Sequence, residues 1–184
     1  MQSNKTGSRY TFDNFEVSNA NRTAFEKAKQ FAENADSKPL AIFGGTATGK
    51  TYLLYAAKNA IEQNSPELHV IFTTTADMRS ALADILNSGG TSEQFREKYL
   101  QADVLLVDDI QELAGKEAIQ NELILIFNSF YESGKRFMMT SSQKEAGYGI
   151  QNRLVIREFW GDFAVITRAY IHTKFELDPE QEEK

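Results

Sequence analysis

The sequence predicts an α/β fold in which a mostly parallel, five-stranded sheet lies between two layers of helices. Short apolar segments that suit strands buried on both faces alternate with longer segments whose apolar residues recur at helical spacing. A glycine-rich turn follows the first of the short segments and opens directly into a helix. Repeated β-α alternation of this kind is typical of a three-layer α/β/α sandwich.

The predicted strands are short segments rich in apolar and β-branched residues, and proline or glycine bounds several of them. In chain order they are Leu40–Phe43, His69–Thr73, Val104–Val107, Arg136–Thr140 and Phe163–Ile166. The predicted helices show apolar residues three and four positions apart. They run from about Asn21 to Ala35, from the glycine-rich turn to about Gln63, from before Met78 to Gly89, over Glu93–Tyr99, and from before Ile119 to Gly134.

The glycine-rich turn has the spacing of a phosphate-binding loop. Its sequence, Gly44-Gly45-Thr46-Ala47-Thr48-Gly49-Lys50-Thr51, fits glycine, four residues, then Gly-Lys-Ser/Thr. Backbone N–H groups in such a turn converge on a polyphosphate at the positive end of the helix. Lys50 is expected to reach the β- and γ-phosphates, and the Thr51 hydroxyl to ligate Mg²⁺. The predicted nucleotide contacts are Gly45, Thr46, Ala47, Thr48, Gly49, Lys50, Thr51 and Tyr52. An ordinary glycine turn is the alternative, and the strand and helix on either side disfavour it.

Two acidic residues after a buried strand strengthen this interpretation. The apolar segment Val104–Val107 ends in Asp108 and Asp109. Because ligands of parallel sheets bind at the carboxyl ends of the strands, Asp108 is expected in the same crevice as the phosphate loop. Asp108 is predicted to hold Mg²⁺ through water, and Asp109 to act in catalysis by polarising the attacking water. The alternative is that both acids only cap the next helix.

Composition limits the class of protein. A chain of 184 residues is most simply one domain, and its net charge of −6 argues against broad electrostatic binding to nucleic acid. It has no cysteine, no long apolar segment and no signal-peptide core at its polar start, so a cytoplasmic location without membrane contact is predicted. We expect a disordered lead over residues 1–9, a nucleotide-binding domain over 10–170 and a short acidic tail over 171–184.

From Tyr10 to about Ile166 the chain resembles the ATPase core of DnaA, the bacterial chromosomal replication initiator of the AAA+ class. The similar segments are Tyr10–Phe15, Ser18–Arg22, Gly49–Leu54, Glu93–Tyr99, Val104–Gln111, Leu113–Glu117, Arg153-Leu154 and Trp160-Gly161. The opening Tyr10–Phe15 separates the chain from generic helicase loaders, which share only the two nucleotide motifs. The resemblance implies a P-loop NTPase fold of the AAA+ type.

The resemblance also implies roles for residues outside the two motifs. The stretch from Val17 to Arg22 matches the family segment that lies against adenine, so Val17 and Asn21 are implied contacts and ATP or ADP is favoured over GTP. Arg157 falls at the position of the family's arginine finger, which acts on the ATP of a neighbouring subunit. Such a finger implies head-to-tail assembly that can grow into a filament. A surface ion pair is the alternative for Arg157.

Departures from the family pattern bear on function. The sequence ends shortly after Ile166, so the helical lid is expected to be absent or vestigial, and the domains that recruit partners and read duplex sites are expected to be missing. Ala118 and Ile119 stand where the family commonly has an Arg-Thr pair that contacts single-stranded DNA. Weak or no binding to single-stranded DNA, and no sequence-specific binding to duplex DNA, are therefore implied. In the sensor strand, Gln143 stands where the family usually has aspartate.

Two functions follow from these observations. In the first, the protein is an ATP- or ADP-binding regulator or accessory factor in replication initiation. It docks on a full-length initiator or replicative helicase, or on its own copies, through the AAA+ interface. In the second, it is a slow ATPase that acts as a minimal initiator or helicase loader on single-stranded DNA. Intact Lys50, Thr51, Asp108 and Asp109 keep the second open, whereas the departures favour the first. A relic domain that binds nucleotide only for stability is a third possibility.

Overall fold

The computed structural model describes residues 10–142 and 162–166. Five strands form one sheet in the order β2-β3-β4-β1-β5, and every neighbouring pair is parallel. The strands are β1 (Leu40–Gly44), β2 (Val70–Thr74), β3 (Val104–Asp108), β4 (Arg136–Ser141) and β5 (Asp162–Ile166). The predicted α/β class with a parallel five-stranded sheet is therefore confirmed.

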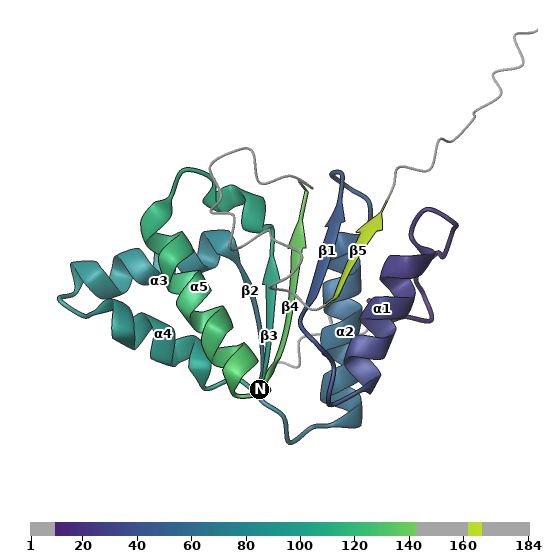
Figure 1. The fold of residues 1–184 in the computed structure, drawn as a ribbon, viewed down its shortest axis with the longest axis horizontal. Helices are drawn as coiled ribbons and strands as arrows, with labels where there is room; N and C mark the ends of the chain where they lie inside the picture. The colour runs from purple at the N-terminus through teal and green to yellow at the C-terminus, as the bar shows by residue number, and fades with distance from the viewer. Residues whose placement is uncertain (1–9, 143–161, 167–184) are drawn as a thin grey trace, which may run out of the picture.

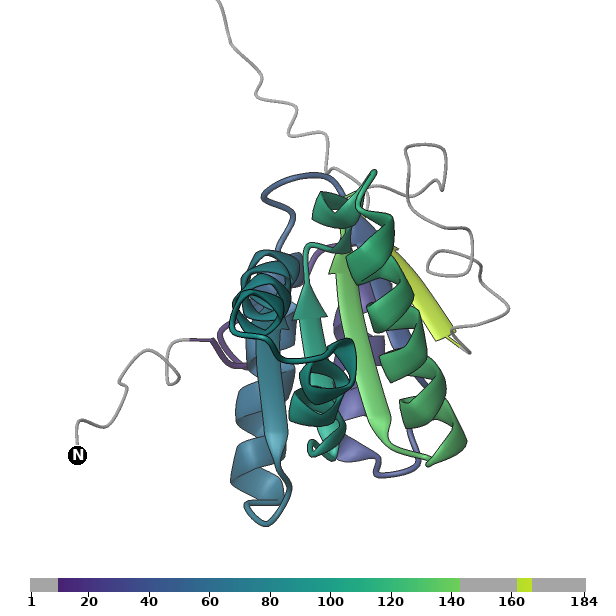
Figure 2. The same ribbon diagram turned by 90° about the vertical axis from the view of Figure 1, so that its left-hand side faces the viewer.

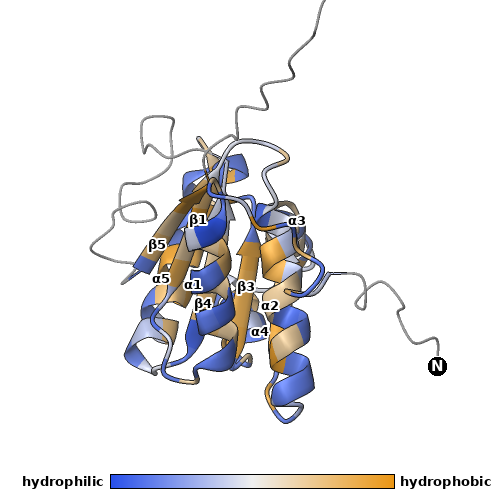
Figure 3. Cartoon of the chain, turned by 90° about the vertical axis from the view of Figure 1, so that its right-hand side faces the viewer, coloured by the Kyte–Doolittle hydropathy of each residue, from blue (hydrophilic) through white to orange (hydrophobic). Residues whose placement is uncertain are grey.

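Helices cover both faces of this sheet, as Figure 1 shows. On one face lie α1 (Arg22–Glu33) and α2 (Lys50–Asn64), and on the other lie α3 (Thr75–Asn87), α4 (Ser92–Leu100) and α5 (Glu117–Glu132). A short 3₁₀ helix, η2 (Ile110–Leu113), follows β3. Figure 2 views the molecule from the side of α3, α4 and α5, and Figure 3 from the side of α1 and α2. Within the described ranges, no helix combines the length and apolarity needed to cross a membrane.

The core is divided by the sheet because successive residues of a strand point to opposite faces. In β1, Leu40 and Ile42 pack against α1 and α2, whereas Ala41 and Phe43 pack against the other helix layer. The inner strand β3, between β2 and β4, is buried along its whole length. Strands covered on both faces carry continuous apolar residues, which is why these segments lack the alternation of a half-exposed strand.

Some element boundaries differ from the sequence-based expectation. Helix α1 ends at Glu33, so Ala35 lies outside it. The chain turns there because the Ser37 hydroxyl donates hydrogen bonds to the carbonyl oxygens of Gln30 and Asn34, at 3.2 and 2.7 Å. Strand β2 starts one residue later than expected, at Val70. The 3₁₀ helix η2 was not anticipated, because four residues are too few to show a helical period.

Candidate functional site

The turn between β1 and α2 lies at the carboxyl end of the sheet and has the backbone of a phosphate loop. Ala47 and Gly49 adopt left-handed conformations, with φ of 59° and 95°. A Cβ atom at Gly49 would lie 3.0 Å from the Phe15 ring, so both the backbone and the close ring favour glycine there. Helix α2 begins at Lys50 without a side-chain cap hydrogen bond. Its first N–H groups are therefore suited to an anionic ligand.

Lys50 is buried inside this turn. The residue is only 5% exposed, and its ammonium donates a hydrogen bond to the Gly45 carbonyl oxygen at 2.8 Å. Burial lowers the pKa of Lys50, and the charges of Asp109 and Asp108 oppose that shift. The structure thus brings Lys50 together with both acids that the sequence predicted for the site. A cation enclosed by a loop and facing two carboxylates is poised to exchange partners with an incoming phosphate.

Asp108 connects the phosphate loop to the next strands of the sheet. The Thr51 hydroxyl donates to Asp108 Oδ2 at 2.7 Å, across 57 residues of sequence. The Thr140 hydroxyl, at the carboxyl end of β4, donates to Asp108 Oδ1. Asp108 and Thr140 are almost completely buried, whereas Thr51 is exposed. The predicted Mg²⁺ pair, Thr51 and Asp108, is therefore assembled.

The oxygen set suits Mg²⁺. That ion usually takes one or two carboxylates, keeps several waters and binds the phosphates of its substrate, so it needs no cage of protein ligands. One carboxylate and one hydroxyl meet this requirement at Asp108 and Thr51. In the described part of the chain no group of three or more His, Cys, Asp or Glu side chains forms a separate metal cluster.

Asp109 has a strained backbone that two neighbours hold, and a third neighbour bonds its carboxylate. Its φ and ψ of 59° and 50° are left-handed, which costs a residue with a Cβ about 1–2 kcal/mol. Its N–H donates to Thr140 Oγ1 at 3.1 Å, and its carbonyl accepts from Thr75 Oγ1 at 2.8 Å. Its carboxylate accepts a hydrogen bond from Gln111. Asp109 stands at the N-cap of η2 without a side-chain cap hydrogen bond, so helix capping does not explain it.

The segment before α1 lies over the start of α2. The Phe15 ring lies 5.2 Å from that of Tyr52, centroid to centroid, and also approaches Gly49. Val17, two residues further on, is 36% exposed. The Asn21 amide is engaged within the turn, because it accepts from Ser18 N at 2.7 Å and donates to Glu16 O at 3.0 Å. Asn21 is the N-cap of α1, but its side chain bonds the preceding turn instead of the helix.

Several residues of the site were not predicted, and some predicted ones cannot be placed. Thr140, Thr75 and Gln111 all contact Asp108 or Asp109 and were not assigned to the site. Thr140 could have been found from its position, because it lies at the carboxyl end of β4, the strand beside β3. Arg157 and Gln143 lie outside the described residues, as do the lead and the tail.

Ala118 and Ile119 help to form an apolar groove between α3 and α5. The groove has a volume of about 320 Å³ and also includes Leu82 and Leu86. Leu86 is 47% exposed. Lys116, at the edge of the groove, donates its ammonium hydrogen bond to the Glu112 carbonyl oxygen. The lining therefore offers mainly apolar contact.

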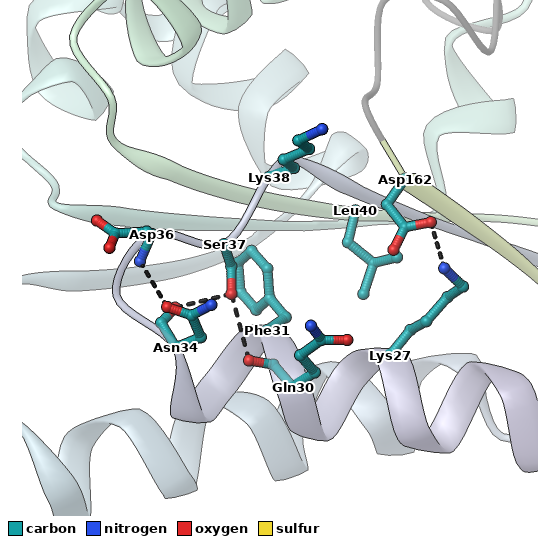
Figure 4. A pocket seen from close by; sticks show the side chains of 9 residues that line it. All are labelled: Lys27, Gln30, Phe31, Asn34, Asp36, Ser37, Lys38, Leu40 and Asp162. Carbon is teal, nitrogen blue, oxygen red and sulfur yellow. Dashed lines mark hydrogen bonds and ion pairs between the residues drawn. The ribbon is translucent and has the colours of Figure 1, made fainter.

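A second hollow lies at the opposite, amino end of β1 and β5, and Figure 4 shows it from close by. Its volume is also about 320 Å³. Lys27 and Asp162 form an ion pair across it, and Ser37 bonds the main chain of α1. Lys27, Asp162 and Ser37 are therefore already bonded to other groups of the protein. The crevice at the carboxyl end remains the stronger candidate site.

Comparison with known proteins identifies the family. Residues 6–164 match the model of the bacterial DnaA ATPase domain. The chain is 39% identical over 151 residues to the chromosomal replication initiator protein DnaA of Thermotoga maritima, which covers 80% of this chain and 34% of that protein. It is 36% identical over 172 residues to the DnaA protein of Helicobacter hepaticus, covering 91% and 37%. The chain thus spans about a third of the length of these curated relatives.

Solved structures agree with the sequence matches. A replication initiator DnaA bound to AMPPCP and single-stranded DNA superposes with a TM-score of 0.80 at 36% identity, covering 88% of this chain and 50% of that one. Domain III of DnaA from Thermotoga maritima gives 0.80 at 37% identity, covering 86% and 67%. The DnaC helicase loader, at 18% identity and a TM-score of 0.67, shares the fold. The phosphate loop, the acids after β3 and these matches together show that the chain belongs to the family of bacterial DnaA ATPase domains, AAA+ domains of replication initiation.

Proposed function

We propose that this domain binds ATP or ADP together with Mg²⁺ at the carboxyl end of its sheet. The observation that carries the proposal is the Thr51–Asp108–Thr140 chain of hydrogen bonds beside the buried Lys50. These contacts join the phosphate loop, β3 and β4 around one crevice. A DnaA protein from Aquifex aeolicus, 37% identical to this chain, has been solved bound to AMPPCP, which supports an adenine nucleotide as the ligand.

Each residue of the crevice has a role in this proposal. The loop amides and Lys50 would hold the phosphates, and Thr51 with Asp108 would hold Mg²⁺, which neutralises phosphate charge. Val17 and Asn21 would line the adenine. Asp109 would polarise the attacking water in a slow hydrolysis reaction. Arg157 would act as an arginine finger on the nucleotide of a neighbouring AAA+ subunit.

At the level of biology, we infer a regulator or accessory factor that docks on an initiator, a replicative helicase or its own copies through the AAA+ interface. The groove between α3 and α5 supports this choice. The lining of the groove is mainly apolar, and Ala118, which is exposed there, lacks the positive charge that phosphate contacts require, whereas Ile119 is buried. A DnaA relative has been solved with single-stranded DNA bound. In this chain we expect such binding to be weak.

An active ATPase that loads a helicase on single-stranded DNA is the second candidate. Asp109 favours it, because three separate contacts hold this acid in a strained conformation beside the crevice. Strain of this kind clusters at functional sites. The two candidates share the nucleotide site and differ in turnover and in DNA dependence.

The test is a titration of the protein with fluorescent ATP and ADP, with sedimentation measured in the same samples. We expect binding of both nucleotides that depends on Mg²⁺. A protein that stays monomeric with ATP, and turns over no faster with single-stranded DNA, supports a regulator that needs a partner. ATP-dependent growth in size, with DNA-stimulated turnover, supports the loader. If neither nucleotide binds, both candidates are wrong.

A further inference from the structure

Gln111, in the first turn of η2, joins the ends of two strands at the carboxyl edge of the sheet. Its side-chain Nε2 donates a hydrogen bond to Asp109 Oδ1 at 2.9 Å. Its Oε1 accepts one from the backbone N–H of Ser142, also at 2.9 Å. Ser142 directly follows β4, which ends at Ser141. A single amide group therefore spans the distance from the acid after β3 to the residue after β4.

The chemistry of its partners fixes which end of the Gln111 amide faces which group. An ionised carboxylate only accepts hydrogen bonds, and a backbone N–H only donates them. Nε2 must therefore face Asp109, and Oε1 must face Ser142. A glutamate side chain has the same length but no proton to donate when ionised, and methionine offers neither group. Among side chains of this length, only glutamine satisfies both contacts.

Other contacts to Asp109 fix its main chain and leave its carboxylate free to rotate. The hydroxyls of Thr75 and Thr140 bond its carbonyl and its N–H, and both threonines are completely buried. The Gln111 bond is the one that reaches the carboxylate from the described residues. It uses Oδ1, so Oδ2 has no hydrogen-bond partner within the described part of the chain.

We propose that Gln111 is a positioning residue. It orients the Asp109 carboxylate so that Oδ2 faces the attacking water, and it ties that carboxylate to Ser142 so that the acid moves with the end of β4. The inference rests on the proposed function, in which Asp109 polarises water during ATP hydrolysis. Misplacing a reacting group by about 1 Å can cost about 100-fold in rate, so a residue that sets orientation can matter without touching substrate.

Two variants of Gln111 test the inference. Gln111→Met removes both hydrogen bonds at similar side-chain length. Gln111→Glu keeps an acceptor for Ser142 and places a like charge against Asp109. For both we expect kcat for ATP hydrolysis to fall about 10- to 100-fold, while the Kd values for ATP and ADP change by less than about twofold. Turnover, nucleotide titration and the melting temperature are measured on the same preparations.

Gln120 provides a matched control. It is completely buried, and its Nε2 donates to the Leu113 carbonyl oxygen at the other end of η2, at 2.7 Å, with no hydrogen bond to Asp109. Gln120→Met is expected to lower the melting temperature and to keep the kcat of the folded protein. A merely structural role for Gln111 would give this same pattern. Unchanged kcat in the Gln111 variants, or equal losses in kcat and affinity, would overturn the inference.

If the turnover of the wild-type protein is too slow to measure, the affinity for a transition-state mimic provides a second test. ADP with aluminium fluoride imitates the transferring phosphoryl group, so its affinity relative to ADP alone reports the same positioning. We expect the wild-type protein to bind the mimic more tightly than ADP alone. In Gln111→Met we expect this ratio of affinities to fall about tenfold. If the wild-type protein binds the mimic no more tightly than ADP, the positioning role of Gln111 is wrong, while the proposed nucleotide binding stands. Wild type that binds neither ATP nor ADP overturns the proposed function instead.

Discussion

Among the residues that the structure describes, each end of the sheet buries one cation, and the two cations have different partners. Lys50 at the carboxyl end and Arg136 at the amino end are both 5% exposed, and burial lowers the pKa of each. Arg136, the first residue of β4, donates hydrogen bonds to the carbonyl oxygens of Phe31 and Ala32 at 3.3 and 3.5 Å. Its guanidinium carbon lies 6.0 Å from the centroid of the Phe31 ring.

The partners of the two cations differ in where they lie along the chain. Arg136 bonds the last turn of α1, about 105 residues away in sequence, and so joins a strand to the free carbonyls of a helix end. Lys50 bonds the carbonyl of Gly45, five residues away in its own loop. Replacing Arg136 would remove the hydrogen bonds between β4 and α1. Replacing Lys50 would remove a hydrogen bond within one loop. Burial alone therefore does not distinguish a structural cation from a binding cation, and we propose that the connectivity of its partners does.

Replacing Arg136 should give the largest effect on stability. We expect Arg136→Met to lower the free energy of unfolding by about 3 kcal/mol, because two buried carbonyl oxygens lose their donor. Nucleotide affinity of the folded protein should not change. Urea denaturation measures the first quantity, and titration with fluorescent ADP the second. Arg136→Lys keeps the positive charge but not the planar guanidinium, and it should lower the free energy of unfolding by less than Arg136→Met does. If Arg136→Met weakens nucleotide binding as much as it lowers stability, Arg136 is not a purely structural cation and the contrast with Lys50 is wrong.

Replacing Lys50 should show the opposite pattern. We expect Lys50→Met to weaken ATP binding about 100-fold, because no ammonium then neutralises the phosphates. The melting temperature should stay the same or rise, because burying an apolar side chain avoids the desolvation of a charge. Thermal denaturation without nucleotide and titration with ATP measure the two effects. If Lys50→Met destabilises the free protein as much as Arg136→Met, Lys50 is also a structural cation.

Much of the fold could be predicted because its signals are local. The segments that form β1 and β3 are continuous and apolar, and each leads directly into residues of the crevice. The phosphate loop is contiguous, so its spacing alone predicted Lys50 and Thr51 as site residues. The pairing of Thr51 with Asp108 also followed, because parallel strands bring their carboxyl ends to one edge.

The remainder depended on contacts that no local pattern encodes. Gln111 reaches Ser142 only because Asp109 turns the chain into η2 with a left-handed backbone. That backbone persists because Thr75 and Thr140, from two other strand ends, hold it. At Asn21, residue type gave the correct N-cap position but not the side-chain partner, since Ser18 competes for its oxygen.

The smallest effect we predict concerns the proton on Lys50. Burial places its pKa below the ordinary 10.5, so in the free protein part of Lys50 is neutral at alkaline pH. Because the unfolded chain binds more protons in that interval, stability without nucleotide should rise with pH towards 10.5. ATP phosphates favour the ammonium and raise its pKa, so binding at an alkaline pH below 10.5 should take up a fraction of a proton. Calorimetry in two buffers of different ionisation enthalpy measures this uptake. Lys50→Arg, always charged, should show none. No uptake by wild type would mean that Asp108 and Asp109 keep Lys50 charged despite its burial.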